Sequence, residues 1–131
     1  YIHTGNEKYL NISERICENF IDSVKAENAD AVIPVWDFRL CEEKEPAEDT
    51  SAAAITASAV CEILKYRKNE KLRSYYEEVT AELIKEKYFD SSTDIPGMIR
   101  ESNGLHHYTL FGDYYFMELL AKKEYHLISL W

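Results

Sequence analysis

An uncharged run of small and apolar residues, SAAAITASAVC at residues 51–61, constrains the fold more than any other feature of this chain. In a protein of which 30% of the residues are charged, a helix that is apolar on every face must be surrounded by protein. We therefore predict an enclosed helix that begins at Thr50 or Ser51, where Asp49 is one competent N-cap, and continues to Leu64.

Three further helices are predicted, of which one is enclosed and two are amphipathic. The enclosed helix opens at Gly112-Asp113 and is apolar to Ala121, apart from one glutamate. The amphipathic helices start at a cap on Asn6 and after Asn69. Their predicted buried faces are Tyr9, Ile12, Ile16, Phe20 and Val24 in the first helix, which ends near Lys25, and Leu72, Tyr75, Tyr76, Val79 and Leu83 in the second.

The two halves of the chain resemble each other. NEKYLNISERICENFI, from Asn6, aligns with NEKLRSYYEEVTAELI, from Asn69, and the aspartates that open the two enclosed helices, Asp49 and Asp113, have nearly the same separation. This pattern indicates a duplicated helical hairpin in the order outer, inner, outer, inner. Because stacked hairpins of this kind need neighbours, the chain is predicted to be an arc of a larger all-α ring with its inner layer half open.

Two long connections, at about residues 26–49 and 89–111, are predicted to emerge at one end of the stack, together with the N-termini of the inner helices. Helix N-termini favour a carboxylate, an arginine adds a bidentate contact, and a tryptophan offers a flat face to a sugar ring. The residues that this rim gathers are Trp36, Asp37, Arg39, Asp49, Asp113 and Tyr114.

Four of these residues also have a purely structural interpretation. Asp49 and Asp113 are in the simplest view helix caps, which contribute about 1 kcal/mol each. Trp36 could plug the top of the bundle, and Arg39 could balance the acidic connector at residues 42–45.

Composition excludes several classes of partner. A net charge of -9 argues against a nucleic-acid backbone, and no apolar run is long enough to span a bilayer. The three cysteines, Cys17, Cys41 and Cys61, are far apart and are expected to be buried or half-buried thiols. His106 and His107 are adjacent and would diverge as ligands, so we expect no metal and no cofactor.

Three motifs resemble the C-terminal part of the unsaturated glucuronyl hydrolases, glycoside hydrolase family 88. They are PVWDFRL, EDTSAAAITASAVCEIL and FGDYYFMELL, and the opening GNEKYL is also similar to the start of an outer helix in that family. The resemblance covers nearly all 131 residues and implies a single domain, residues 1–131, that is part of an (α/α)6 barrel. The chain also starts at Tyr1, almost directly before a helix, and is expected to be a piece of a longer polypeptide.

The resemblance further implies hydrolysis of oligosaccharides left by polysaccharide lyases, whose terminal uronic acid carries a C4–C5 double bond. An aspartate protonates this vinyl ether and activates water, which is general acid–base work unlike that of ordinary glycosidases. The catalytic aspartates of the family are expected upstream, so none is assigned here, and the chain alone is expected to be inactive and to self-associate. The candidates for contact with, or support of, an anionic oligosaccharide are Trp36, Asp37, Arg39, Asp49 and Ser51.

Two other functions remain open. A stand-alone helical-repeat module could grip a peptide with its tyrosine-rich rim, although the uncapped apolar helix at residues 112–121 disfavours this interpretation. Within the enzyme class, an unsaturated rhamnogalacturonyl hydrolase is the nearest alternative. The sequences DTSAAAITAS and GDYYFMEL favour the glucuronyl type. The segment GMIRESNGLHHYTLFGD is shorter than the usual family loop.

Overall fold

The computed structural model describes residues 1–26, 28–40, 46–92, 94, 96–104 and 107–125, and the protein is all-α as predicted. Its elements are α1 (Glu7–Lys25), η1 (Phe38–Leu40), α2 (Thr50–Leu64), α3 (Glu70–Leu83), η2 (Ser102–Gly104) and α4 (Leu110–Tyr125). Isolated bridges join Val35 to Glu48 and Phe89 to Ile99, one within each long connection. None of the helices in the described ranges is long and apolar enough to cross a membrane.

Three of the predicted helix starts are confirmed, because each follows from a side chain that accepts a backbone N–H one turn ahead. Asn6 caps α1, Asp49 caps α2 and Asn69 caps α3. Asn69 does more than cap: its Nδ2 donates to carboxylate oxygens of Glu14, at 2.9 Å, and Glu18, at 2.8 Å. The start of α3 is thereby held against the side of α1.

The predicted start of the last helix was wrong. Helix α4 begins at Leu110 rather than at Gly112-Asp113, because the hydroxyl of Thr109 accepts the backbone N–H of Gly112 at 3.1 Å and so supplies the cap. Asp113 therefore lies inside the first turn and caps nothing. Its carboxylate instead accepts hydrogen bonds from the backbone of the second long connection.

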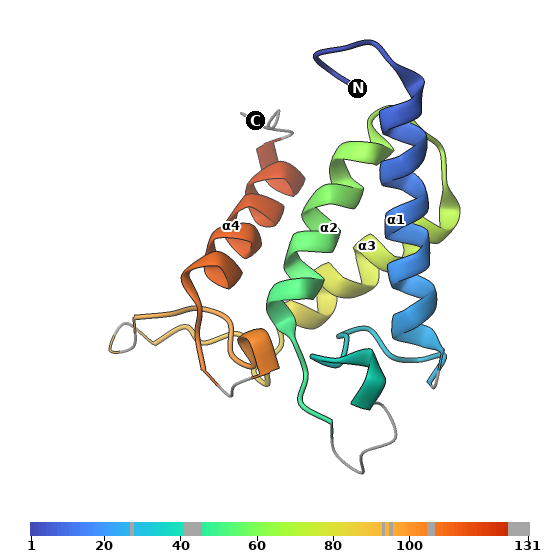
Figure 1. Cartoon of the computed structure of the whole chain (residues 1–131). Coiled ribbons are helices and arrows are strands. Elements are labelled where there is room, and N and C mark those ends of the chain that lie inside the picture. Colours follow the sequence, from blue (N-terminus) through green and yellow to red (C-terminus); the bar gives the residue numbers. More distant parts are fainter. Residues whose placement is uncertain (27, 41–45, 93, 95, 105–106, 126–131) are drawn as a thin grey trace.

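Helix α2 lies at the centre of the molecule, where it packs against α4, α3 and α1 (Figure 1). Ala53, Ala54 and Ala57 are completely buried, and their small side chains let the neighbouring helices come close. The predicted face of α3 is confirmed, with Tyr76 partly buried at its margin. The other buried apolar residues of the core are Leu10, Cys17, Ile21, Val24, Ile33, Val60, Ile63, Leu72, Tyr75, Val79, Leu83, Tyr88, Ile99, Phe116 and Leu119.

The predicted buried face of α1 was largely wrong. Helix α1 has two apolar stripes, and α2 covers the one that the prediction left out. The buried residues are Leu10, Cys17, Ile21 and Val24, of which only the last was predicted. Phe20, which was also predicted, is partly buried against the core. The other three predicted residues, Tyr9, Ile12 and Ile16, are exposed by 52%, 36% and 61%. Periodicity alone places both stripes on a helix but does not say which one a neighbour covers.

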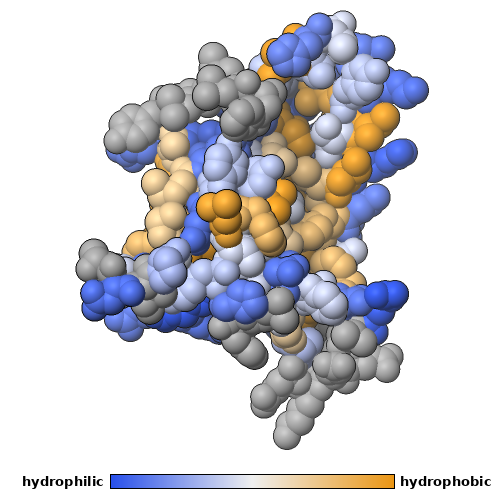
Figure 2. Space-filling model, turned by 60° about the vertical axis from the view of Figure 1, so that its left-hand side comes forward, coloured by the Kyte–Doolittle hydropathy of each residue, from blue (hydrophilic) through white to orange (hydrophobic). Residues whose placement is uncertain are grey.

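Both long connections lie at the end of the bundle where α2 and α4 begin, and the N-terminus of the chain lies at the opposite end (Figure 1). The predicted rim is confirmed in this respect. The inner layer is open, as expected: on the face shown in Figure 2 apolar side chains gather across the middle, between hydrophilic ends. The exposed apolar side chains of α2 and α4 are Ile55, Leu110, Phe111, Tyr114 and Met117.

The two asparagine caps offer a matched test of how the bundle is held together. Asn69→Ala is expected to lower the free energy of unfolding by about 2 kcal/mol, because the cap and the contacts to α1 are both lost. Asn6→Ala removes an exposed cap that contacts its own turn and should cost about 1 kcal/mol or less. Urea denaturation of both variants measures the difference, and equal losses would show that the contacts of Asn69 to α1 contribute nothing.

Candidate functional site

The carboxylate of Asp49 joins the start of α2 to the second long connection. Its Oδ1 accepts the backbone N–H of Ser51 at 3.0 Å, the hydroxyl of Ser51 at 2.5 Å, and the N–H groups of Ala52 and Asn103 at 3.1 and 2.9 Å. Asp49 is 9% exposed and Ser51 is 2% exposed. Two of the predicted candidates for contact with, or support of, a sugar are thus engaged with each other and with the backbone, beneath the surface.

Thr50 makes a second link between α2 and the same connection. Its backbone N–H donates to the carbonyl of Glu101 at 3.0 Å, and its hydroxyl donates to the carbonyl of Arg100 at 2.6 Å. Thr50 is fully buried. Residues 100–103 are therefore held over the N-terminus of α2 by three hydrogen bonds. Thr50 donates two of them, and Asp49 accepts the third from Asn103.

Asp113 plays the corresponding part at α4. Its Oδ1 accepts the backbone N–H groups of Met98 and Ile99, both at 3.0 Å. The aspartates at the starts of the two inner helices thus both bind backbone of the segment 98–103. The sequence showed that the two aspartates occupy equivalent positions, but it did not predict that both accept backbone N–H groups of this segment.

The segment at the end of this connection has an unusual backbone. Glu101, Asn103 and Gly104 have φ angles of 58°, 58° and 67°, in the left-handed region that non-glycine residues rarely adopt. A Cβ on Gly104 would lie 2.4 Å from Cγ of Trp36, so this glycine is also required by the close approach of the indole. Such conformations persist only where surrounding contacts hold them, and they gather at functional sites.

Trp36 lies on this segment and not in the bundle. The indole Nε1–H donates to Oδ1 of Asn103 at 3.4 Å, and 51% of the residue is exposed. The plug interpretation therefore does not describe its surroundings. Through Asn103, whose N–H is bound by Asp49, the indole is connected to the cap of α2 and presents a half-exposed face at the rim.

Asp37 and Arg39 form a pair. Arg39 donates through Nε and Nη2 to both carboxylate oxygens of Asp37, the shortest contact being 2.5 Å, and its backbone N–H donates to the same carboxylate at 3.0 Å. These hydrogen bonds lower the pKa of Asp37 to about 2 and raise the pKa of Arg39. The side chain of Arg39 is 88% exposed. The acidic connector at residues 42–45 lies outside the described residues.

An ionic group that was not predicted holds the second long connection, the one that contains residues 98–103. Asp90 accepts the hydroxyl of Tyr108 at 2.7 Å, the backbone N–H of Ser92 at 2.9 Å and Nη2 of Arg100 at 2.5 Å. These bonds, with that of Tyr108 the strongest, lower the pKa of Asp90 to about 2. The residues of this group lie up to 18 positions apart in the chain, and the sequence around Asp90 gave no signal that they would meet.

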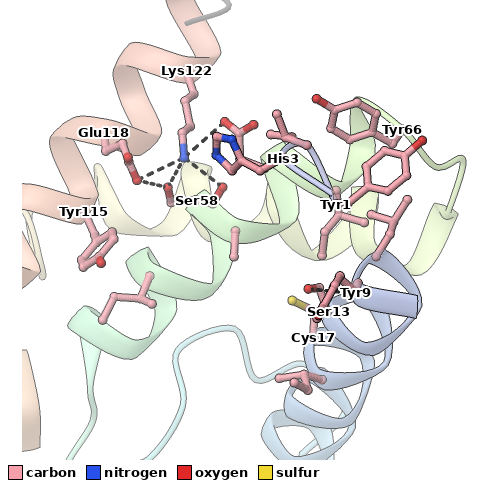
Figure 3. Close-up of a pocket in the computed structure, with 17 residues that line it drawn as sticks. Tyr1, His3, Tyr9, Ser13, Cys17, Ser58, Tyr66, Tyr115, Glu118 and Lys122 are labelled. Atoms are coloured by element: carbon pink, nitrogen blue, oxygen red, sulfur yellow. Dashed lines mark hydrogen bonds and ion pairs between the residues drawn. The ribbon is translucent and has the colours of Figure 1, made fainter. Parts of the chain in front are cut away.

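A buried polar cluster lies between α2 and α4 (Figure 3). The ammonium of Lys122, which is 5% exposed, donates to Ser58 Oγ at 2.8 Å and lies 3.1 Å from Glu118 and 3.4 Å from Glu62. Ser58 in turn donates to Glu118 at 2.5 Å. The sequence analysis did not predict this cluster. A serine and a glutamate in otherwise apolar helices, Ser58 and Glu118, could have indicated it.

This cluster lines the inner groove, a hollow of about 530 Å³ bordered by α1, α2 and α4. Figure 3 shows Tyr9, Ser13 and Cys17 of α1 on its other side. Burial raises the pKa of the Cys17 thiol to about 11, so this cysteine is no nucleophile. Cys41 and His106 fall outside the described residues, and the described ranges contain no group of three side chains able to hold a metal ion.

Tyr114, the last of the predicted rim residues, lies on the open side of α4. It is 41% exposed and packs edge-on against Tyr115, with ring centroids 5.1 Å apart. The structure thus connects Trp36, Asp49 and Ser51 through Asn103, pairs Asp37 with Arg39, and places Tyr114 in a different aromatic contact.

Known proteins of similar sequence show to which enzymes this chain is related. An unsaturated glucuronyl hydrolase of Formosa agariphila is 30% identical over 132 residues, which cover 95% of this chain and 32% of that protein. Another, of Bacillus sp. strain GL1, is 26% identical over 98% of this chain and 36% of its own length. The chain is a distant homologue of unsaturated glucuronyl hydrolases. It spans about a third of the length of these curated relatives, and no family model matches it.

Solved structures agree with this unsaturated glucuronyl hydrolase homology. The crystal structure of the Bacillus sp. GL1 enzyme, described as responsible for the degradation of glycosaminoglycan, superposes with a TM-score of 0.75 at 26% identity. The superposition covers 92% of this chain and 34% of the enzyme. A variant of an unsaturated glucuronyl hydrolase named with dGlcA-Glc-Rha-Glc matches with the same values. The homology is thus one of structure as well as sequence.

The four donors on Asp49 lead to a stability prediction. Asp49→Ala should lower the free energy of unfolding by about 2–3 kcal/mol, because a cap is lost and buried donors are left without an acceptor. Asp49→Asn keeps one acceptor oxygen and should cost less than half as much. Thermal or urea unfolding compares the two. An equally large loss in both variants would mean that the negative charge, and not the accepted hydrogen bonds, is what α2 requires.

Asp90 leads to a prediction about pH. Its pKa of about 2 in the folded protein lies below the ordinary 3.8, so between these values the unfolded chain binds more protons. The stabilisation is therefore fully present above about pH 4 and is lost as the pH falls towards 2. The difference in free energy of unfolding between wild type and Asp90→Asn should shrink over this window, measured by urea denaturation at several pH values.

The exposed Asp94 supplies the control for this pH dependence. Asp94→Asn makes the same chemical change in the same connection without removing a contact of Asp90, so it shows how much of the change in Asp90→Asn is specific to that site. A difference between wild type and Asp90→Asn that stays constant from pH 5 to pH 2 would contradict the lowered pKa.

Proposed function

We propose that this chain is the C-terminal third of a glycoside hydrolase of the unsaturated glucuronyl hydrolase type, contributing two of the six helical hairpins of an (α/α)6 barrel. The parent activity is removal of a terminal 4,5-unsaturated uronic acid from lyase-generated oligosaccharides by hydration of the vinyl ether. The observation that carries the proposal is the homology over 95% or more of the chain to two enzymes of that name. The catalytic carboxyl groups belong to the part of the barrel that this chain does not contain.

In this proposal the rim supplies contacts to the sugar. The half-exposed face of Trp36 stacks on a sugar ring, and the exposed guanidinium of Arg39 has N–H donors beyond those bound to Asp37. These donors suit the carboxylate of a uronic acid. Asp37 holds the guanidinium in place through their hydrogen bonds.

Asp49 and Ser51 support the rim from beneath its exposed residues and do not contact the sugar. They are buried, and their polar groups are engaged with the start of α2 and with Asn103. Their proposed role is to keep the segment under Trp36 in position, so their loss would displace the stacking face without removing any atom that contacts the sugar.

A free-standing helical-repeat module is supported less well. Such a module needs a polar outer face on its last helix. The open side of α4 carries Leu110, Phe111, Tyr114 and Met117, which are between 41% and 88% exposed. Both curated relatives are glucuronyl enzymes, which also favours this type over the rhamnogalacturonyl one.

A chimera tests the proposed function. Replacing the matching third of the Formosa agariphila enzyme with this chain should give a protein that hydrolyses an unsaturated disaccharide, followed as loss of the absorbance of its double bond. This chain alone should show no turnover. In the chimera Trp36→Ala should raise KM about tenfold, which corresponds to about 1.4 kcal/mol of lost binding.

Trp36→Phe is the matched control, because it keeps a flat apolar face and loses the bond to Asn103. It should retain most of the affinity that Trp36→Ala loses. A folded chimera that is inactive, or an active one in which Trp36→Ala has no effect on KM, would contradict the proposal or the role of Trp36, respectively. Turnover by the isolated chain would contradict the placement of the catalytic groups elsewhere.

A further inference from the structure

Asn103 lies beside the exposed indole of Trp36, and the structure fixes which way its side-chain amide is turned. The indole Nε1–H can only donate a hydrogen bond, so the atom that it meets at 3.4 Å is the amide oxygen Oδ1. The amide nitrogen Nδ2 carries two N–H donors. Because the oxygen and the nitrogen occupy different corners of a planar amide, Nδ2 is turned away from the indole nitrogen.

The two donors on Nδ2 of Asn103 have no acceptor in the part of the chain that the structure describes. The hydrogen bonds of this residue involve only its Oδ1, which accepts from Trp36, and its backbone N–H, which donates to Asp49. Asn103 is exposed. Nδ2 of Asn69, by contrast, donates to two glutamates of α1. The amide of Asn103 is therefore held by its oxygen and offers its nitrogen at the rim.

The strained backbone at this point sets the position of the amide. Asn103 has a φ of 58°, and its N–H is held by the buried carboxylate of Asp49 at 2.9 Å. At Gly104, with a φ of 67°, an added Cβ would lie 2.4 Å from Cγ of Trp36. The left-handed turn thus brings the backbone against the indole and the amide of Asn103 to the indole nitrogen. Conformations of this kind cost energy and gather at functional sites.

An aromatic face with a hydrogen-bond donor at its edge suits a sugar ring. The apolar C–H face of the sugar packs on the indole, and the hydroxyl groups, which project outward from the sugar ring, then lie near the edge of the indole. Binding sites commonly combine apolar contact area with a few placed polar groups that fix the orientation of the ligand. The neutral amide of Asn103 suits a hydroxyl oxygen, whereas a uronate carboxylate suits the guanidinium of Arg39.

We propose that Asn103 is a further sugar-binding residue of the rim, and that its Nδ2 donates to a hydroxyl oxygen of the sugar that stacks on Trp36. This inference rests on the proposed function, which supplies the oligosaccharide and the stacking role of Trp36. The indole contributes contact area, which differs little between sugars of similar shape. Asn103 contributes specificity, because its donor favours a sugar with a hydroxyl group at one position.

Nuclear magnetic resonance tests the contact in this chain, which contains both residues. On titration with a 4,5-unsaturated uronyl disaccharide, the Nε1–H signal of Trp36 and the Nδ2 signals of Asn103 should shift with the same apparent Kd. The Nδ2 signals of Asn69, which are held by Glu14 and Glu18, should stay in place. A shift of Trp36 without Asn103 would overturn the inference. If neither residue responds, the inference is overturned together with the stacking role of Trp36.

Variants of the chimera separate a direct contact from mere support of the indole. Asn103→Gly keeps the left-handed backbone without strain and removes the amide, so KM should rise about fivefold with little change in kcat. In the Trp36→Phe background, where no indole N–H is left to hold, Asn103→Gly should still raise KM by about twofold or more. No further rise in that background would show that Asn103 acts only through Trp36, and the inference would be wrong. Asn28→Gly, at an exposed asparagine of the first long connection, is the matched control and should leave KM unchanged.

Disaccharides that each lack one hydroxyl group identify the acceptor. One of them should have a KM about fivefold higher in the chimera, and Asn103→Gly should not raise the KM of that analogue further, because the contact is already absent. If Asn103→Gly raises the KM of every analogue by the same factor, no hydroxyl is contacted and the inference is overturned.

The inference and the proposed function fail separately. An active chimera in which Asn103→Gly leaves KM unchanged overturns the inference alone. An inactive chimera contradicts the proposed function, and the titration of this chain then decides whether Asn103 contacts the sugar.

Discussion

The burial of α2 is the constraint on which the rest of the structure depends. Its alanines let α3 and α4 approach closely, and α1 covers a third side. Since small side chains contribute little area each, the stability of this centre comes from close packing of the helices around it. The need to enclose this helix explains why the chain alternates amphipathic and apolar helices, and why α4, with one packed side, leaves an apolar edge.

The same helix organises the rim. Its N-terminus is capped by Asp49, and this carboxylate also binds the backbone of Asn103, so the cap of a core helix holds a loop 54 residues away. The loop adopts left-handed conformations at Glu101 and Asn103 and carries the indole of Trp36 on Gly104. Stability of the core and placement of the candidate sugar-binding face are therefore coupled through one side chain.

Resemblance and geometry contribute different parts of the functional argument. The three motifs pointed to the unsaturated glucuronyl hydrolases, and the relatives and solved structures confirm distant homology over about a third of those proteins. The motif residues Asp49 and Ser51 turn out to be buried and engaged, whereas Trp36 and Arg39 are exposed. The motifs thus identified the region of the candidate site. Only the contacts and exposure in the structure show which of its residues support the backbone and which are open to a ligand.

The sequence by itself determined the helices that start with Asn6, Asp49 and Asn69, because a cap is a contact between a side chain and the backbone two or three residues away. It also determined that α2 must be enclosed, because no charge lies on any of its faces from Ser51 to Cys61. Only the tertiary structure decided which stripe of α1 is covered, that Asp113 binds the backbone at Met98, and that Lys122 is buried. These outcomes depend on which surfaces meet across long separations in the chain, and local patterns carry no information about that.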